Sequence, residues 1–173
     1  DRLHTRLSVG MENIKNYTYL AFSGYGEQMT SGSTRFYNDI APRQYSGNIQ
    51  VLSATLNQDF ALGILHWDNE VTAQYSSRDD ILPLPLVNVY SNLYLKFTYA
   101  KVLRIQLGGD VRYFTAYYAP TYCPGFGMYH LQNADPDARV PIGDYPIVNV
   151  YANFHLKQCR FYVMYSHVNE GLF

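Results

Sequence analysis

The stretch LRIQLGGDVRY, residues 103–113, indicates the fold class of this chain. Its odd-numbered positions are apolar, aromatic or glycine, whereas its even-numbered positions are mostly polar and include Arg104 and Arg112. Successive side chains of a β-strand point to opposite faces, so this strand has one apolar face and one polar face. The sequence therefore predicts an amphipathic strand with a different environment on each side.

Three further segments show the same alternation, at residues 65–75, 87–99 and 146–157. The eight prolines and the abundance of Tyr, Val, Phe and Thr favour strands over helices. We therefore expect an all-β, antiparallel fold. Its eight strands are predicted at about residues 3–12, 17–24, 45–56, 60–75, 87–99, 103–117, 146–156 and 160–169.

The predicted connections between these strands are of two kinds. Tight links are expected at residues 57–59, 100–102, 157–159 and 13–16. Longer segments rich in Gly, Pro, Ser, Asn and Asp cover residues 24–44, 76–85 and 118–145. Long amphipathic strands with short turns at one end and long loops at the other are typical of transmembrane β-barrels. Residues 1–173 are thus predicted to form one up-and-down transmembrane β-barrel domain, or a C-terminal segment of a larger barrel.

Composition excludes several classes of protein. The 13 Lys and Arg against 14 Asp and Glu give a net charge of -1, so there is no basic field to attract nucleic acid. Hydrophobic residues make up 47% of the chain, yet no apolar run reaches the roughly 18 residues of a membrane-spanning helix. A barrel strand needs only about 9 to 11 residues and alternates polar with apolar side chains, so composition allows it.

No cofactor or metal is expected. Cys123 and Cys159 are not spaced as metal ligands, either to each other or to the five histidines. Cys123 falls in a predicted long loop and Cys159 in a predicted tight turn. A barrel would hold them about 25 Å apart or more, too far for a disulfide. We therefore expect two free thiols.

Four blocks resemble the C-terminal part of the putative porins of the Bacteroidetes: LHWDNE (65–70), LPLPLVNVYSNLYLKF (82–97), LGGDVRYFTAYYAP (107–120) and DYPIVNVYANFHLK (144–157). The resemblance implies an outer-membrane β-barrel, located in a bacterial outer membrane and longer than this chain. It also implies that both ends of the chain are fragment ends. The family supplies no catalytic residues.

Nine polar residues are candidates for lining the barrel interior: His66, Asp68, Glu70, Lys96, Arg104, Gln106, Asp110, Arg112 and His155. Opposite charges on neighbouring strands can pair, so this wall could be a polar conduit or a packed plug. Four aromatic residues of the loop 118–145 are candidates for solute contact: Tyr122, Phe126, Tyr129 and His130. They could instead pack the loop against the rim.

The sequence thus predicts an outer-membrane β-barrel that passes or contacts small polar solutes, with membrane lipid as its other partner and with no chemistry. One alternative is a soluble β-barrel or β-sandwich that binds an apolar or sugar ligand, with the apolar positions inward. A remote alternative is a jelly-roll glycoside hydrolase using Asp68 and Glu70, which lie about 7 Å apart on one strand face.

Overall fold

The computed structural model describes residues 2–132 and 136–171. Within these ranges the chain consists of β-strands that pair antiparallel, which confirms the all-β, antiparallel part of the predicted fold. A single 3-10 turn, η1 (Pro136–Ala138), interrupts the strands. The strands are β1 (Arg2–Lys15), β2 (Thr18–Gln28), β3 (Thr34–Gln44), β4 (Asn48–Leu62), β5 (Leu65–Ser76), β6 (Val87–Tyr99), β7 (Leu103–Phe114), β8 (Thr121–Cys123), β9 (Met128–His130), β10 (Ile147–Leu156) and β11 (Cys159–Tyr165).

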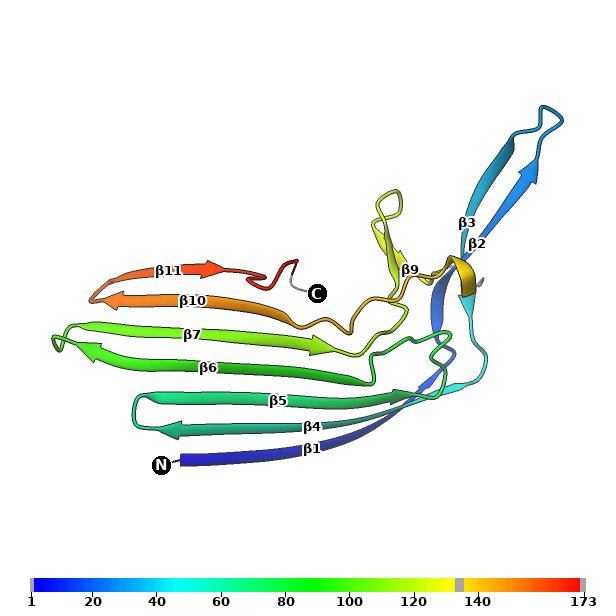
Figure 1. Cartoon of the computed structure of the whole chain (residues 1–173). Coiled ribbons are helices and arrows are strands. Elements are labelled where there is room, and N and C mark those ends of the chain that lie inside the picture. The colour runs from blue at the N-terminus through cyan, green and yellow to red at the C-terminus, as the bar shows by residue number, and fades with distance from the viewer. Residues whose placement is uncertain (1, 133–135, 172–173) are drawn as a thin grey trace.

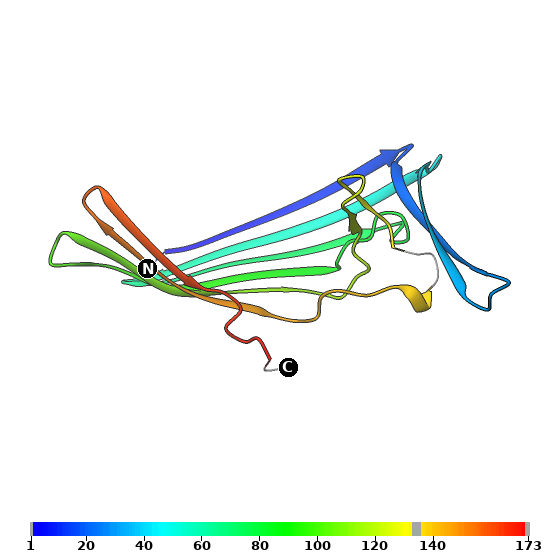
Figure 2. The ribbon, with the colours of Figure 1, turned by 90° about the horizontal axis from the view of Figure 1, so that it is seen from above.

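Seven strands form one sheet in the order β1-β4-β5-β6-β7-β10-β11 (Figure 1). From β4 onward each strand of the sheet pairs with the one before it, which is an up-and-down arrangement. Figure 2 shows that the sheet is twisted and curved. It is open, with β1 and β11 as its edges, so the predicted closure into a barrel is not present in this sheet.

The connections differ in length at the two ends of the sheet. Tight turns follow β4, β6 and β10, whereas residues 16–47, 77–86 and 115–146 make the long connections at the opposite end (Figure 1). The tight turns contain left-handed residues, among them Gly63 with φ 61° and Lys101 with φ 59°. The predicted asymmetry of the connections is confirmed.

The first tight link was predicted in the wrong place. Residues 57–59 lie inside β4, and the turn instead uses Gly63 and Ile64. Asn57 and Asp59 are polar because they point to the polar face of a strand, and the left-handed φ of Gly63 supplies the turn. The strand predicted at residues 45–56 therefore continues to Leu62 as β4, and the strand predicted at residues 60–75 begins only at Leu65 as β5.

The predicted link at residues 13–16 does not join a hairpin. β1 pairs with β4, Lys15 lying opposite Asn48, while β2 pairs with β3. The predicted loop 24–44 thus contains β3, and the β2–β3 hairpin projects from the loop end of the sheet (Figure 1). Residues 118–145 also contain the short β8–β9 hairpin, and the predicted strands 103–117 and 160–169 end earlier, at Phe114 and Tyr165.

The sheet has almost no conventional core. Among the residues whose burial is described, the only buried apolar side chains are Ile49 of β4 and Ile81 and Pro85 of the β5–β6 loop. The accessible surface is 12505 Å², against about 8,700 Å² for a compact monomer of this mass. Among the described residues, no helix is long and apolar enough to cross a membrane.

Candidate functional site

The strand register separates the side chains of the sheet onto two faces. One face, here called the apolar face, carries side chains such as Leu7, Leu56, Val71, Leu93 and Leu107, which stay partly or largely exposed. Leu107, for example, is 39% exposed. Single exposed apolar residues are normal on proteins, but a continuous exposed face is not typical of a soluble monomer.

Aromatic side chains lie towards both ends of the apolar face. Five are the third residue from the short-turn end of their strand: Phe60, Trp67, Phe97, Phe154 and Phe161. Tyr75, Tyr113 and Tyr165 lie towards the loop end. Along β5, Trp67 and Tyr75 are separated by about 27 Å, from a rise of about 3.4 Å per residue. The indole Nε1 of Trp67 donates to Ser91 Oγ at 2.9 Å, so its polar atom is satisfied on this face.

The opposite face, here called the polar face, holds all nine residues predicted to line an interior. The register places His66, Asp68 and Glu70 of β5 on the same side as the even-numbered residues of β6 and β7. His155 of β10 joins them because it lies opposite Arg104. The remaining predicted residues on this face are Lys96, Gln106, Asp110 and Arg112. Whether they line a water-filled interior stays a prediction.

The nine predicted candidates leave out several residues of the polar face. They are His4, Arg6, Asn57, Asp59, Tyr90, Asn92, Tyr94, Asn149, Tyr151, Asn153, Arg160 and Tyr162. The odd-numbered residues of β4 point to this face, because the turn at Gly63 and Ile64 pairs them with the even-numbered residues of β5. The alternation of residues 87–99 and 146–157 already gives Asn92, Asn149, Tyr151 and Asn153 the polar side of their strands, whereas Asn57 and Asp59 required the correct turn position and the strand pairing.

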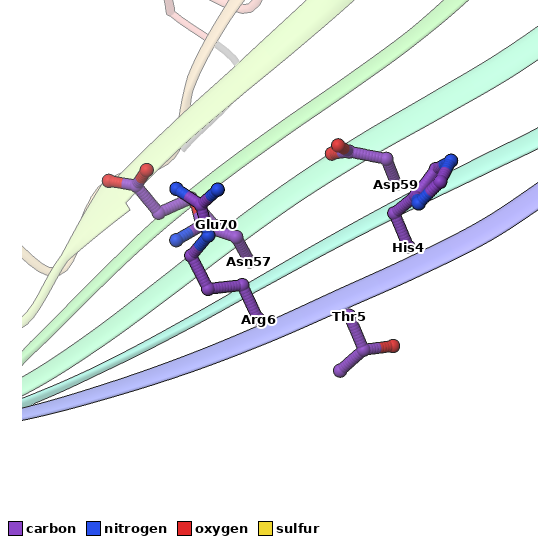
Figure 3. Close-up of a pocket in the computed structure, with 6 residues that line it drawn as sticks. All are labelled: His4, Thr5, Arg6, Asn57, Asp59 and Glu70. Atoms are coloured by element: carbon purple, nitrogen blue, oxygen red, sulfur yellow. The ribbon is translucent and has the colours of Figure 1, made fainter.

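A polar hollow of about 670 Å³ lies at the β1–β4–β5 side of the polar face. Its lining includes His4, Arg6, Asp59 and Glu70, which Figure 3 shows on one side of the strands. Thr5, also part of the lining, points to the other side of β1. The hollow therefore combines carboxylates and cations on adjacent strands of an open surface.

Buried polar contacts hold β7, β10 and the C-terminal segment together. Asn149 Nδ2 donates to Asp110 Oδ2 at 2.9 Å, and Asn149 Oδ1 accepts the backbone N–H of His167 at 3.0 Å. Asp110 and Asn149 are only 7% and 9% exposed. Arg112 Nε lies 3.7 Å from the same carboxylate of Asp110. This pair therefore anchors the middle of the polar face.

A glycine permits a second polar bridge beside it. Tyr151 OH donates to Asn92 Oδ1 at 3.0 Å, which spans from β10 across β7 to β6. A Cβ at Gly108 would lie 2.5 Å from Tyr94 Cβ and 2.9 Å from Tyr151 OH, so only glycine leaves room. Tyr151 thus lies on the polar face.

The carboxylates of the hydrolase alternative have an unexpected neighbour. Asp68 lies directly opposite Asp59 on β4, so a second carboxylate-bearing strand does face it. A separate question is metal binding: among the described residues, no group of three His, Cys, Asp or Glu is placed to hold a metal ion. The two cysteines are free, Cys123 in the long connection and Cys159 beside the last tight turn.

The candidate loop residues belong mostly to the β8–β9 hairpin. Tyr122 and Tyr129 pack against each other with ring centroids 5.2 Å apart. His130 stacks on Phe22 of β2, with 5.5 Å between ring centroids, while Phe126 is exposed at the hairpin turn. The hairpin is thereby attached to β2, and both contact with a solute and packing against the rim remain predictions.

An ion pair shapes the shorter loop between β5 and β6. Arg78 donates two hydrogen bonds to the Asp80 carboxylate, at 2.8 and 2.6 Å, and its guanidinium lies over the Tyr45 ring. The hydrogen bonds from Arg78 lower the pKa of Asp80 below its ordinary value. The contact of Arg78 with Tyr45 holds this loop near the start of β4.

Comparison with known proteins agrees with this geometry. The family model described as "Putative porin" matches residues 1–173, which is the whole chain. No curated protein and no solved structure is similar enough to match. The chain therefore belongs to the putative porin family.

Proposed function

We propose that this chain forms part of the wall of a transmembrane β-barrel in a bacterial outer membrane. The apolar face contacts lipid and the polar face lines an aqueous interior. The observation that carries the proposal is the continuous, exposed apolar face of a sheet in which Ile49 is the only buried apolar side chain among the residues whose burial is described. In lipid, such a sheet satisfies its backbone groups through neighbouring strands and needs no apolar core.

The aromatic rows support the same placement. With strands tilted by about 40°, the 27 Å between Trp67 and Tyr75 corresponds to about 20 Å across the membrane, close to the apolar band of outer-membrane barrels, about 25 Å. Tyr and Trp rings favour the interface between hydrocarbon and headgroups. Closure requires partners for the edge strands β1 and β11, whose backbone groups cannot stay unpaired in lipid.

The proposed role is porin-like passage or contact of small polar solutes, without chemistry and without a cofactor. Both charge signs on the polar face support a hydrated surface over an apolar ligand site, and membership of the porin family supports passage. The sheet favours this over the soluble alternative, because that fold would enclose the apolar face, which is exposed here.

The test uses the full-length protein. We expect it to fractionate with the outer membrane, to migrate as a folded species in detergent gels unless boiled, and to give stepwise ion conductance in planar lipid bilayers. Recovery in the aqueous fraction without detergent, together with silent bilayers, would contradict the proposal.

A further inference from the structure

Cationic side chains gather at the short-turn end of β6, β7, β10 and β11. Five of the thirteen lysines and arginines of the chain lie there, together with His155. This group, here called the basic corner, consists of Lys96, Lys101, Arg104, His155, Lys157 and Arg160. The sequence contains no Asp or Glu at residues 81–109 or 145–169, so these strands bring almost no acidic neighbours.

Three members of the basic corner form a row across adjacent strands. Arg104 lies opposite His155, and His155 lies opposite Arg160. Directly opposed side chains have Cβ atoms about 5 Å apart, and like charges in this position destabilise a sheet. Arg104 and Arg160 flank His155 from its two sides and lie two strand spacings apart, and neither has an acidic residue opposite it, because Arg104 faces Thr98 and His155 and Arg160 faces His155.

The charges of this row are not neutralised within the described chain. The ion pairs found among the described residues join Arg78 to Asp80 and Arg112 to Asp110, and neither includes the basic corner. Arg104 and Arg160 are exposed. The carboxylates Asp59, Asp68 and Glu70 instead lie on β4 and β5, on the other side of β6. The polar face thus combines carboxylates and cations on its β1–β4–β5 side, whereas the basic corner on its opposite side has no ion pair among the described residues.

We propose that the basic corner binds the oxyanion groups, carboxylate or phosphate, of small dissolved solutes. This rests on the proposed function, because it assigns a solute class to the same polar face. An arginine guanidinium forms paired, charge-assisted hydrogen bonds with such groups. Arg104 and Arg160 are separated by two strand spacings, about 10 Å, so a solute with two oxyanion groups could contact both.

Position on the sheet favours a dissolved solute over a lipid headgroup. Arg104, His155 and Arg160 point to the polar face, whereas their sequence neighbours Phe154 and Phe161 point to the apolar face. A lipid packed against the apolar face would lie on the wrong side of the sheet for these side chains. The site therefore opens to the aqueous side.

The test measures binding of inorganic triphosphate to the detergent-folded, full-length protein by isothermal titration calorimetry. We expect salt-sensitive binding that is about tenfold weaker in the double variant Arg104→Gln/Arg160→Gln. The matched control Arg6→Gln/Arg43→Gln removes the same charge from two exposed positions outside the basic corner, on β1 and β3, and should change affinity by no more than about twofold. The pair Arg104→Lys/Arg160→Lys should retain part of the binding.

Two results overturn the inference: no binding by the unchanged protein at low salt, or equal affinity for the double variant and the unchanged protein. Conductance measured on the same protein distinguishes failure of the proposed anion site from failure of the proposed pore. If the protein conducts ions but does not bind triphosphate, the proposed pore is supported and the proposed anion site is wrong. If the protein binds triphosphate through Arg104 and Arg160 but never conducts ions, the proposed anion site is supported and the proposed pore is wrong.

Discussion

Replacing Leu7 by arginine is expected to lower the free energy of unfolding in lipid by about 2–4 kcal/mol, the cost of a cation near the middle of a lipid-facing barrel surface. Leu7 lies opposite Leu56, which lies opposite Val71, midway between Trp67 and Tyr75. Leu7 is 68% exposed. If this surface faced water, the same change would be nearly neutral, within about 0.5 kcal/mol.

The matched control is Ser8→Arg, one residue along β1 on the polar face. Ser8 is also exposed, so the two variants differ mainly in the environment of the new charge. Unfolding of the full-length protein in urea, from lipid vesicles, measures both. Equal free energies of unfolding for the two variants would contradict the proposal that the apolar face contacts lipid.

The second large effect is expected from Asn149→Asp, which places a new carboxylate against Asp110. The two side chains are nearly buried, and the change replaces an amide donor by a like charge. Leaving the Asp110 carboxylate without its donor should cost about 3 kcal/mol at neutral pH. Asn149 Oδ1 also accepts from His167, and an aspartate oxygen can still do so. The loss would therefore report on the contact with Asp110.

Asn153→Asp provides the comparison for this effect. Asn153 lies on the same strand and face, opposite Gln106 and Tyr162, with no carboxylate at those positions. We expect its free energy of unfolding to change by less than about 1 kcal/mol. Similar losses in both variants would mean that the Asp110–Asn149 pair does not anchor the polar face.

The parts of the fold that were predictable depend on local alternation. Residues 103–113 determine their own two faces, because side chains alternate along any strand. The turns at residues 100–102 and 157–158 also follow from local sequence, since the apolar alternation breaks there. The nine predicted residues share a face for this reason.

Strand pairing was less accessible to sequence reasoning. The pattern of β1 does not show that its partner is β4 and not β2, because any amphipathic strand presents the same alternation. Because the tight turn lies at Gly63 and Ile64 and not at residues 57–59, the odd-numbered residues of β4 share a face with the even-numbered residues of β5. Asp59, which was predicted to lie in the turn, is therefore on the polar face. Contacts such as Asn149 with Asp110 join residues far apart in sequence, so only the register reveals them.

Lipid-mediated fluorescence quenching tests the central claim most directly. With Cys123 and Cys159 replaced by serine, single cysteines at Val71 and Thr72, or at Leu107 and Gln106, would carry an environment-sensitive label. The full-length protein would then be folded into vesicles of brominated lipid. We predict strong quenching at Val71 and Leu107 and weak quenching at Thr72 and Gln106. Equal quenching at both members of each pair, or the reverse order, would contradict a lipid-facing apolar surface.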